Sequence, residues 1–306
     1  MNRGIYITAN DRATEQSIAL LKSIRVYDAE TPVVLIPYDE HYHHVADVLA
    51  HQFGVTVYED LEFIDRLSRQ LYDIFGEGFF ARPNQFRKQA CWFGPFEEFI
   101  YIDTDIVVFE KIIDNLNYLT EYDFICADYQ HAGGIANVFT PKVLEAGVLT
   151  EQECGDIFNG GFWGSKQHRI SESDLYSIFQ ECAAHPDYFD FSQKTSDQPI
   201  MNYMVLKQIP KRFNIVRRPG KAPGNWAGSP HFQIQGDRLF DPKVNQPLQY
   251  LHWAGMRIQP GCPYWEIWEH YRYLGEEKPP IGAQPTGQTP VWRKTLDQIK
   301  LKIKAY

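Results

Sequence analysis

The sequence predicts an α/β fold in which a mostly parallel sheet carries helices on both faces. Short apolar runs alternate, over roughly the first hundred residues, with segments whose apolar residues repeat at helical spacing. Such alternation is typical of parallel strands joined by crossover helices. Several runs are continuously apolar, as expected for strands that are buried on both faces. With 306 residues, 44% of them hydrophobic, the chain can form one large α/β domain or two small ones.

The expected elements follow one another in chain order. Strands are expected at residues 4–8, 33–36, 55–58, 99–109, 123–127, 157–164, 213–216 and 249–253. Helices are expected through Ile18, Leu21, Ile24 and Arg25, from His43 to Phe53, and through Leu61, Ile64, Leu67, Leu71 and Phe75. Two segments rich in Gly and Pro follow: residues 219–236 are a candidate lid and residues 275–290 a candidate linker.

Two acidic residues, Asp103 and Asp105, interrupt the apolar run of residues 99–109. An ionised carboxylate that is buried without a partner is costly, so the fold must supply a cation or open to water. Residues two apart share a face of a strand, so both carboxylates can point into the crevice where open α/β sheets bind ligands. Carboxylates suit Mg²⁺ or Mn²⁺. The alternative, two acids that end a strand and cap a turn, is disfavoured by the apolar flanks.

The overall composition excludes some classes of partner. A net charge of -9 argues against nucleic acid, because binding to a phosphate backbone needs a basic surface. The five cysteines contain no Cys-x-x-Cys pair, so a reducing compartment is expected. The chain enters its first strand with no signal peptide, and no run reaches the roughly 20 apolar residues of a membrane span. We therefore expect a cytoplasmic protein.

Glycine-rich phosphate-binding loops are missing from the sequence. No Gly-x-Gly-x-x-Gly follows the first strand, and no Gly-Lys-Ser/Thr loop is present, which disfavours a dehydrogenase and a phosphate-loop NTPase. An enzyme that forms sugar nucleotides would also need such a loop to hold a triphosphate. If a nucleotide binds, a metal ion and side chains must balance the negative charge of its phosphates.

Three further clusters contain polar residues suited to that task. They are Asn159 with Gly160 and Gly161, Asp197 and Gln198 after an expected helix cap at Ser196, and His252 at the end of an apolar strand. Each also has a simple structural interpretation: a turn, a helix-capping acid and a core histidine. Their joint appearance in this order, after the Asp-x-Asp sequence, favours a functional site.

This order of motifs resembles the retaining glycosyltransferases of the GT-A fold, above all family eight, which includes glycogenin, galactinol synthase and bacterial lipopolysaccharide galactosyltransferases. The resemblance covers about residues 4–260. It implies a GT-A fold, which is Rossmann-like and typical of nucleotide-diphospho-sugar transferases, and transfer of a hexose from a UDP-sugar with Mn²⁺ or Mg²⁺. A related retaining family also carries Asp-x-Asp and Asp-Gln-x-x-x-Asn, which Asp197, Gln198 and Asn202 match. The sequence leaves both memberships open.

The resemblance also implies roles for individual residues. Metal ligands would be Asp103, Asp105 and His252, the last in a His-x-x-Gly segment with Gly255, and Asp103 would also contact the ribose. The donor sugar would be held by Asn159, Asp197, Gln198 and Asp128. The nucleotide would contact Thr8, Asn10, Asp11 and either Arg87 or Lys88. One departure is that Ile258 stands where the family has a lysine for the diphosphate, with Arg257 as the substitute.

The remaining expectations concern mechanism, domains and partners. Retention of configuration is open to same-face attack or to a protein nucleophile, and the weak amide Gln198 favours the former. We expect a catalytic domain over residues 1–260 and an extension over residues 261–306, whose helix at residues 292–304 either docks on the domain or contacts an anionic membrane. The acceptor is a hydroxyl of a glycan, a lipid-linked sugar or a small molecule. The rival functions are a non-catalytic glycan- or sugar-nucleotide-binding module and a sugar-nucleotide-forming nucleotidyltransferase.

Overall fold

The computed structural model describes residues 2–76, 82–128, 134–191, 197–217 and 222–278. The chain divides into two compact units, residues 1–272 and residues 273–306, and the fold reported below is that of the first unit. This unit continues past residue 260, where we expected the catalytic domain to end, because α8 (Trp265–Arg272) packs on α1 (Thr14–Tyr27). Whether residues 1–260 alone form a domain stays a prediction. The expected helix at residues 292–304 lies outside the described residues.

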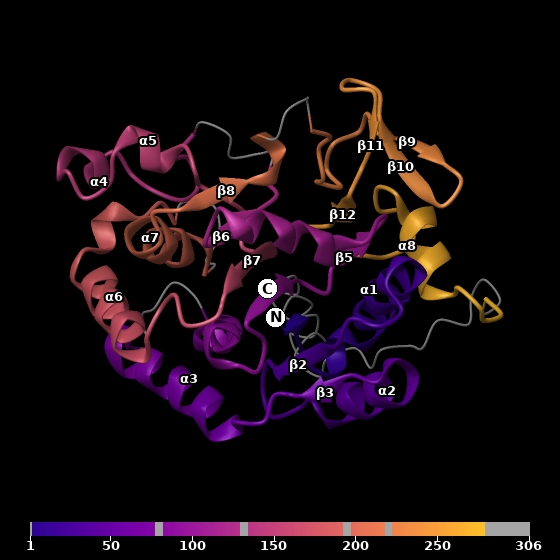
Figure 1. Ribbon diagram of the computed structural model, residues 1–306, viewed down its shortest axis with the longest axis horizontal. Helices are drawn as coiled ribbons and strands as arrows, with labels where there is room; N and C mark the ends of the chain where they lie inside the picture. Colours follow the sequence, from indigo (N-terminus) through magenta and orange to yellow (C-terminus); the bar gives the residue numbers. More distant parts are fainter. Residues whose placement is uncertain (1, 77–81, 129–133, 192–196, 218–221, 279–306) are drawn as a thin grey trace, which may run out of the picture. The chain divides into compact units, whose positions relative to one another are not determined.

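A seven-stranded sheet forms the centre of the first unit (Figure 1), in the order β3-β2-β1-β4-β7-β6-β8. Its strands are β1 (Arg3–Ala9), β2 (Val33–Pro37), β3 (Thr56–Val57), β4 (Glu98–Ile102), β6 (Phe124–Cys126), β7 (Phe162–Lys166) and β8 (Arg212–Asn214). Neighbouring strands are parallel except that β7 runs antiparallel to both β4 and β6. The predicted mostly parallel sheet is confirmed.

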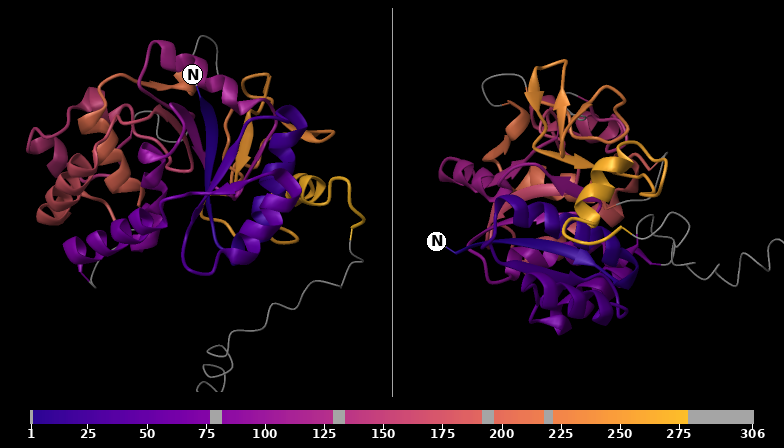
Figure 2. Two further views of the ribbon diagram at one scale, coloured as in Figure 1. Left: turned by 60° about the horizontal axis from the view of Figure 1, so that its bottom comes forward. Right: turned by 90° about the vertical axis from the view of Figure 1, so that its right-hand side faces the viewer.

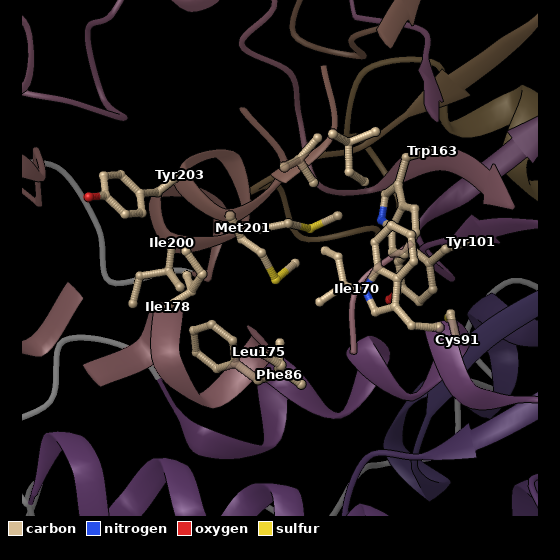
Figure 3. Close-up of a cluster of buried hydrophobic side chains, with 14 of the residues drawn as sticks. Phe86, Cys91, Tyr101, Trp163, Ile170, Leu175, Ile178, Ile200, Met201 and Tyr203 are labelled. Atoms are coloured by element: carbon tan, nitrogen blue, oxygen red, sulfur yellow. The ribbon is translucent and has the colours of Figure 1, made fainter. Parts of the chain in front are cut away.

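Helices cover both faces of this sheet, as the left view of Figure 2 shows. Successive residues of β1 and β4 enter opposite cores: Tyr6 and Tyr101 face one, whereas Ile5 and Ile100 face the other. The first core is closed by α3 (Leu61–Phe75), α6 (Glu172–Ala184), α7 (Gln198–Gln208) and the 3₁₀ helix Pro83–Phe93. The second is closed by α1, α2 (His43–Phe53) and the 3₁₀ helix Ile112–Thr120. Figure 3 shows part of the first core, in which Tyr101 lies beside Trp163.

The three expected helices are confirmed, and their ends follow from local chemistry. The carboxylate of Asp60 accepts a hydrogen bond from the Phe63 N–H at 2.8 Å and so caps α3, satisfying one of the free amides at a helix start. Helix α2 ends at Gly54, whose φ of 68° is the left-handed conformation that glycine adopts without a Cβ penalty. The remaining short helices are α4 (Lys142–Glu145), α5 (Glu151–Cys154) and the 3₁₀ turns Asp11–Ala13, Pro186–Tyr188 and Ile215–Arg217.

The prediction of one strand over residues 99–109 is wrong. Strand β4 leaves the main sheet at Ile102, and a separate strand β5 (Ile106–Val108) pairs antiparallel with β12 (Tyr250–His252). Asp103 and Asp105 therefore lie in the connection between two strands of different sheets, and not on one strand face. The chain turns there because β5 finds its partner in a segment far along the sequence.

Two other expected strands are shorter or displaced. The strand expected at residues 157–164 begins only at Phe162, because the Asn159 carboxamide accepts a hydrogen bond from the Gly161 N–H at 2.9 Å and forms a turn. The strand expected at residues 213–216 is β8, which ends at Asn214, and a 3₁₀ turn follows it. The strands expected near residues 4, 33, 55, 123 and 250 are present.

A third core lies under a small three-stranded sheet, which consists of β9 (Gln233–Gln235), β10 (Arg238–Asp241) and β11 (Gln246–Pro247). Leu239 packs there with Trp253 of the segment after β12 and with Tyr271 of α8. The candidate lid at residues 219–236 is thus not a continuous loop, since it ends in β9. Its described part is fixed: the Gly224 N–H donates to the buried Asp241 carboxylate at 3.1 Å.

Within the described ranges, each helix is too short or too polar to cross a lipid bilayer.

Candidate active site

Three of the predicted ligands meet at the carboxyl end of β4. One potential ligand atom from each of Asp103, Asp105 and His252 lies within 4.8 Å of the others. His252 ends β12, and its Nε2 is 3.1 Å from the Asp105 carboxylate. The side chains of Asp103 and Asp105 are 33% and 31% exposed, so that they face solvent while His252 is buried. The connection between β4 and β5, together with the end of β12, therefore assembles the predicted metal cluster.

A glycine turn makes room for this cluster. The Asp103 N–H donates to the Gly161 carbonyl at 2.8 Å, which holds the acidic connection against the start of β7. A Cβ on Gly161 would lie 2.4 Å from His252 Cε1 and 2.8 Å from Asp103 Oδ2, closer than van der Waals contact permits. The side chains thus converge on a space that only a glycine leaves open.

The ligand atoms and their charges fit a hard divalent cation. The pKa of Asp103 is raised, mainly by burial and also by the nearby charge of Asp105, although the Lys88 ammonium acts in the opposite direction. Burial opposes the charged forms of Asp105 and His252, but their mutual attraction lowers the pKa of Asp105 and raises that of His252. Two carboxylates and an imidazole beside solvent suit Mn²⁺ or Mg²⁺ with open positions. A cation there would offset the repulsion between the two acids.

A buried ion pair adjoins the cluster on the side of Asp103. The Lys88 ammonium lies 2.8 Å from the Asp197 carboxylate and 3.9 Å from that of Asp103. It also donates to the Gly160 carbonyl at 3.4 Å and lies over the Tyr101 ring. Burial alone would lower the pKa of Lys88, but Asp103 and Asp197 raise it above its usual value, so the group stays charged. Lys88 therefore links the metal cluster to the acid that the resemblance assigns to the donor sugar.

Tyr101 is a site residue that the sequence interpretation missed. Its hydroxyl donates to the Asp103 carboxylate at 2.6 Å. Burial, with the Asp103 charge, raises the pKa of Tyr101 well above its usual value, which keeps the hydroxyl a donor. The available signal was its position two residues before Asp103, because residues two apart in an extended segment point to the same side.

Asp197, at the start of helix α7, reaches the site through its ion pair with Lys88, whereas the role of Gln198, the first residue of the helix, stays a prediction. Asp197 is itself the residue that precedes the helix, and its side chain makes no capping hydrogen bond, which differs from the expected place in the first turn. Ser196, the expected cap, lies outside the described residues. The Asn202 carboxamide donates to the Phe158 carbonyl at 2.8 Å and accepts from the Phe158 N–H at 2.9 Å. These two hydrogen bonds fix α7 beside the turn that carries Asn159.

Asp128 also lies within electrostatic range of the cluster. It is buried, and the Asn214 carboxamide bonds both its N–H, at 3.1 Å, and its carbonyl, at 2.8 Å. Burial lowers the pKa of His252, and the charges of Asp105, Asp103 and, more weakly, Asp128 raise it. The structure thus places Asp128 near the metal cluster, and its contact with the donor sugar stays a prediction.

The predicted nucleotide contacts Thr8, Asn10 and Asp11 lie at the end of β1 and directly after it. The parallel register pairs Tyr6 with Tyr101, and Thr8 follows Tyr6 by two residues on the same face of β1. Asn10 donates to Asp39 at 2.7 Å, and the Asp11 carboxylate accepts from the Val45 N–H at 2.9 Å, near the start of α2. Their roles in nucleotide binding stay predictions.

The other two cationic candidates are not part of the cluster. Arg87 donates to Asp65 and to Ser68, each at 2.8 Å. It lines a cavity of about 310 Å³ with Pro37, Tyr42 and Ile64, among other residues. Arg257 is exposed in the segment after β12. Of the basic candidates, Lys88 is the one that contacts the metal cluster.

Comparisons with known proteins concern the family and the fold. The family model described as "Mannosyltransferase putative" matches residues 2–123, which include the acidic connection but not His252. No curated protein matches the chain in sequence.

Solved structures show the fold. The galactosyltransferase LgtC, in complex with donor and acceptor sugar analogues, has a TM-score of 0.59 at 13% identity, over 88% of this chain and 95% of LgtC. An active-site mutant of LgtC gives a TM-score of 0.62 at 12% identity, over 91% and 98%. The bifunctional glycosyltransferase WbbM, without ligand, gives 0.57 at 12% identity over 89% of this chain. The chain spans about half of WbbM, 49% of its length. This chain therefore has the fold of the GT-A glycosyltransferases and resembles those of family eight.

Proposed function

We propose that this protein is a metal-dependent glycosyltransferase that transfers a hexose from a UDP-sugar to a hydroxyl acceptor with retention of configuration. The observation that carries the proposal is the row of contacts from Asp197 through Lys88 and Asp103 to Asp105 and His252. It supports a cation site for the diphosphate directly beside a charged contact for the donor sugar.

Each residue of this row has a role in the proposed reaction. Asp103, Asp105 and His252 would hold Mn²⁺ or Mg²⁺, which would stabilise the negative charge of the departing diphosphate as a Lewis acid. Lys88 holds the Asp197 carboxylate in place through the ion pair, and Tyr101 orients Asp103. These contacts fix the geometry before the reaction begins, so that no reorganisation is required in the transition state.

The sugar itself would be held by hydrogen-bond acceptors. The anomeric carbon becomes oxocarbenium-like as the diphosphate leaves, and Asp197, Asn159 and Asp128 would accept hydrogen bonds from the sugar hydroxyls to position it. The bond from this carbon to the phosphate oxygen breaks, the acceptor oxygen forms the new bond on the same face, and its proton passes to the released phosphate. Gln198, a weak amide nucleophile, favours this route over a covalent enzyme intermediate.

Two kinds of sugar nucleotide are candidates for the donor. The resemblance to family eight favours UDP-galactose or UDP-glucose, whereas the family model that matches residues 2–123 favours a mannose donor. The donor panel therefore includes GDP-mannose.

The test measures release of free nucleoside diphosphate from a panel of sugar nucleotides, with Mn²⁺ and with EDTA. We expect slow hydrolysis of one donor that depends on metal, and we expect Asp105→Asn to abolish it. The result that contradicts the proposal is that no donor in the panel is hydrolysed, or that hydrolysis proceeds equally in EDTA.

Membrane contact through the basic segment 292–304 is a separate proposal, as is a cytoplasmic location. Removal of the residues after Thr289 should abolish co-sedimentation with anionic vesicles, because each Lys or Arg near such a surface contributes about 1 kcal/mol. Full-length protein that fails to co-sediment would contradict it.

A further inference from the structure

Trp226 stands out among the tryptophans that the structure describes, because it is 37% exposed while the others are buried or partly buried. It belongs to no helix or named strand and lies in the segment between β8 and β9. Nothing in the proposed handling of the metal and the donor uses this side chain.

The backbone places Trp226 directly beside a metal-site residue. The His252 N–H donates to the Asn225 carbonyl at 2.7 Å, and the Ala227 N–H donates to the His252 carbonyl at 2.9 Å. These bonds form a parallel bridge between Trp226 and His252. Residues paired in this way lie about 4.8 Å apart and direct their side chains to the same face. The indole therefore lies on the face from which His252 reaches the cluster.

The indole is held in one orientation. Its N–H donates to the Ala254 carbonyl at 3.3 Å. A Cβ on Gly228 would lie 2.4 Å from two atoms of the ring, so the benzo ring rests on the Gly228 backbone. One face of the ring is thus covered by the chain, the polar edge is bonded, and the exposed area is aromatic.

The segment that carries Trp226 is anchored on both sides. The Asn225 carboxamide donates to the Ala127 carbonyl at 2.6 Å and to the Tyr250 hydroxyl at 2.8 Å. Gly224 is bonded to Asp241 of β10. The ring is therefore a fixed surface, and little conformational entropy is lost when a ligand covers it.

We propose that the exposed indole face of Trp226 binds the pyranose ring of the acceptor, so that the acceptor is a sugar with an apolar C–H face. This inference rests on the proposed function. An aromatic ring that is flat, rigid and half-open offers a large apolar contact next to hydrogen-bonding groups. The donor-sugar residues Asp197 and Lys88 adjoin Asp103, whereas Trp226 adjoins His252 at the opposite end of the row of contacts. Because same-face attack brings the acceptor hydroxyl in beside the departing diphosphate, we place the acceptor on this metal side of the donor sugar.

The first experiment measures binding without any reaction. Saturation-transfer difference NMR is recorded on the full chain with the methyl glycosides of glucose, galactose and mannose, in the presence of UDP and Mn²⁺. We expect saturation to reach the C–H protons of one ring face, to persist in Trp226→Phe and to disappear in Trp226→Ala. Tyr72→Ala, at an exposed aromatic of α3 (48% exposed), is the matched control and should keep the wild-type signal.

The second experiment compares transfer with hydrolysis. In the presence of the glycoside that binds, Trp226→Ala should lower the ratio of transfer to donor hydrolysis by at least tenfold, as truncation of a central aromatic anchor does. Gly228→Ala, which displaces the ring without removing it, should lower the same ratio.

The inference is overturned if no glycoside gives a signal with the wild-type protein, or if Trp226→Ala gives the same signal as wild type. It is also overturned if Trp226→Ala lowers transfer and hydrolysis equally, since Trp226 would then belong to the donor site. A failure of the proposed function is distinguished by the absence of donor hydrolysis in the wild-type protein, which leaves the NMR measurement valid.

Discussion

The Lys88 ammonium and the Asp197 carboxylate form an ion pair at 2.8 Å, in which the two side chains are only 8% and 10% exposed. A buried pair is weak evidence for stability, because desolvation offsets much of the attraction. Removal of one partner is different, since it leaves the other charge buried and unpaired. Stability therefore depends on the same two residues that the proposed function uses.

Lys88→Met should lower the free energy of unfolding by about 3 kcal/mol, because Asp197 is left without a counter-charge. Urea unfolding in EDTA measures this. The control is Lys142→Met, which breaks an ion pair of similar length, 2.9 Å to Asp187, between side chains that are 59% and 49% exposed; its effect should be close to zero. Equal losses in the two variants would show that the Lys88 pair is solvated.

Asp197→Asn should lower donor turnover roughly a hundredfold, the range for one electrostatic contact that strengthens in the transition state. The affinity for UDP should change much less, because the proposed contact is to the sugar. Turnover is measured by release of nucleoside diphosphate and affinity by calorimetry. A loss of UDP affinity with unchanged turnover of bound donor would move Asp197 to the nucleotide site.

The sequence predicted the regular part of the fold because its signals are local. The continuous apolar run at Val33–Pro37 and the helical repeat at Leu61–Phe75 are encoded by their own residues, and both elements are present. Residues 99–109 are equally apolar, but their division into two strands is decided by β12, far along the chain. No pattern within the run reveals that partner.

The candidate site, too, could be predicted only where the signal lies in the local sequence. Asp103, Asp105 and His252 could be proposed from motif order, and the structure brings them together. The pairing of Lys88 with Asp197 depends on how a 3₁₀ helix and α7 meet across the first core, and this contact has no sequence periodicity. The sequence motifs identified which residues belong to the site. Which of these residues contact one another is decided by tertiary packing.

Gly161→Ala should weaken Mn²⁺ binding by at least about tenfold, because the added methyl group would meet His252 at 2.4 Å and Asp103 at 2.8 Å and would displace ligands, an effect comparable to loss of a supporting contact. Gly160→Ala is the matched control: its Cβ would have its nearest contact at 3.5 Å, to Met201. Free Mn²⁺ is measured by electron paramagnetic resonance. Equal Mn²⁺ affinity in the two variants would contradict a cation site between Asp103 and His252.

Asp28→Asn should reveal a pH-dependent contribution to stability in the turn between α1 and β2. Asp28 is 5% exposed, and its carboxylate accepts from the Thr31 hydroxyl at 2.5 Å and from the Thr31 N–H at 3.1 Å. Burial opposes ionisation, but these hydrogen bonds lower the pKa of Asp28 below its usual value of 3.8. A carboxylate with a lowered pKa in the folded state stabilises the protein above its unfolded pKa, and this contribution is lost as the pH falls through the folded pKa.

Asp28→Asn should therefore lower the free energy of unfolding by about 1.5 kcal/mol at pH 7, as expected for hydrogen bonds to a charged group. The difference from wild type should shrink as the pH falls below about 3.8, because the wild-type carboxylate then becomes neutral. Urea unfolding at pH 7, 5 and 3 measures the difference. Asp47→Asn, at an exposed position of α2, controls for the removal of one negative charge. A difference between Asp28→Asn and wild type that stays constant from pH 7 to pH 3 would show that shape, and not charge, makes Asp28 stabilising.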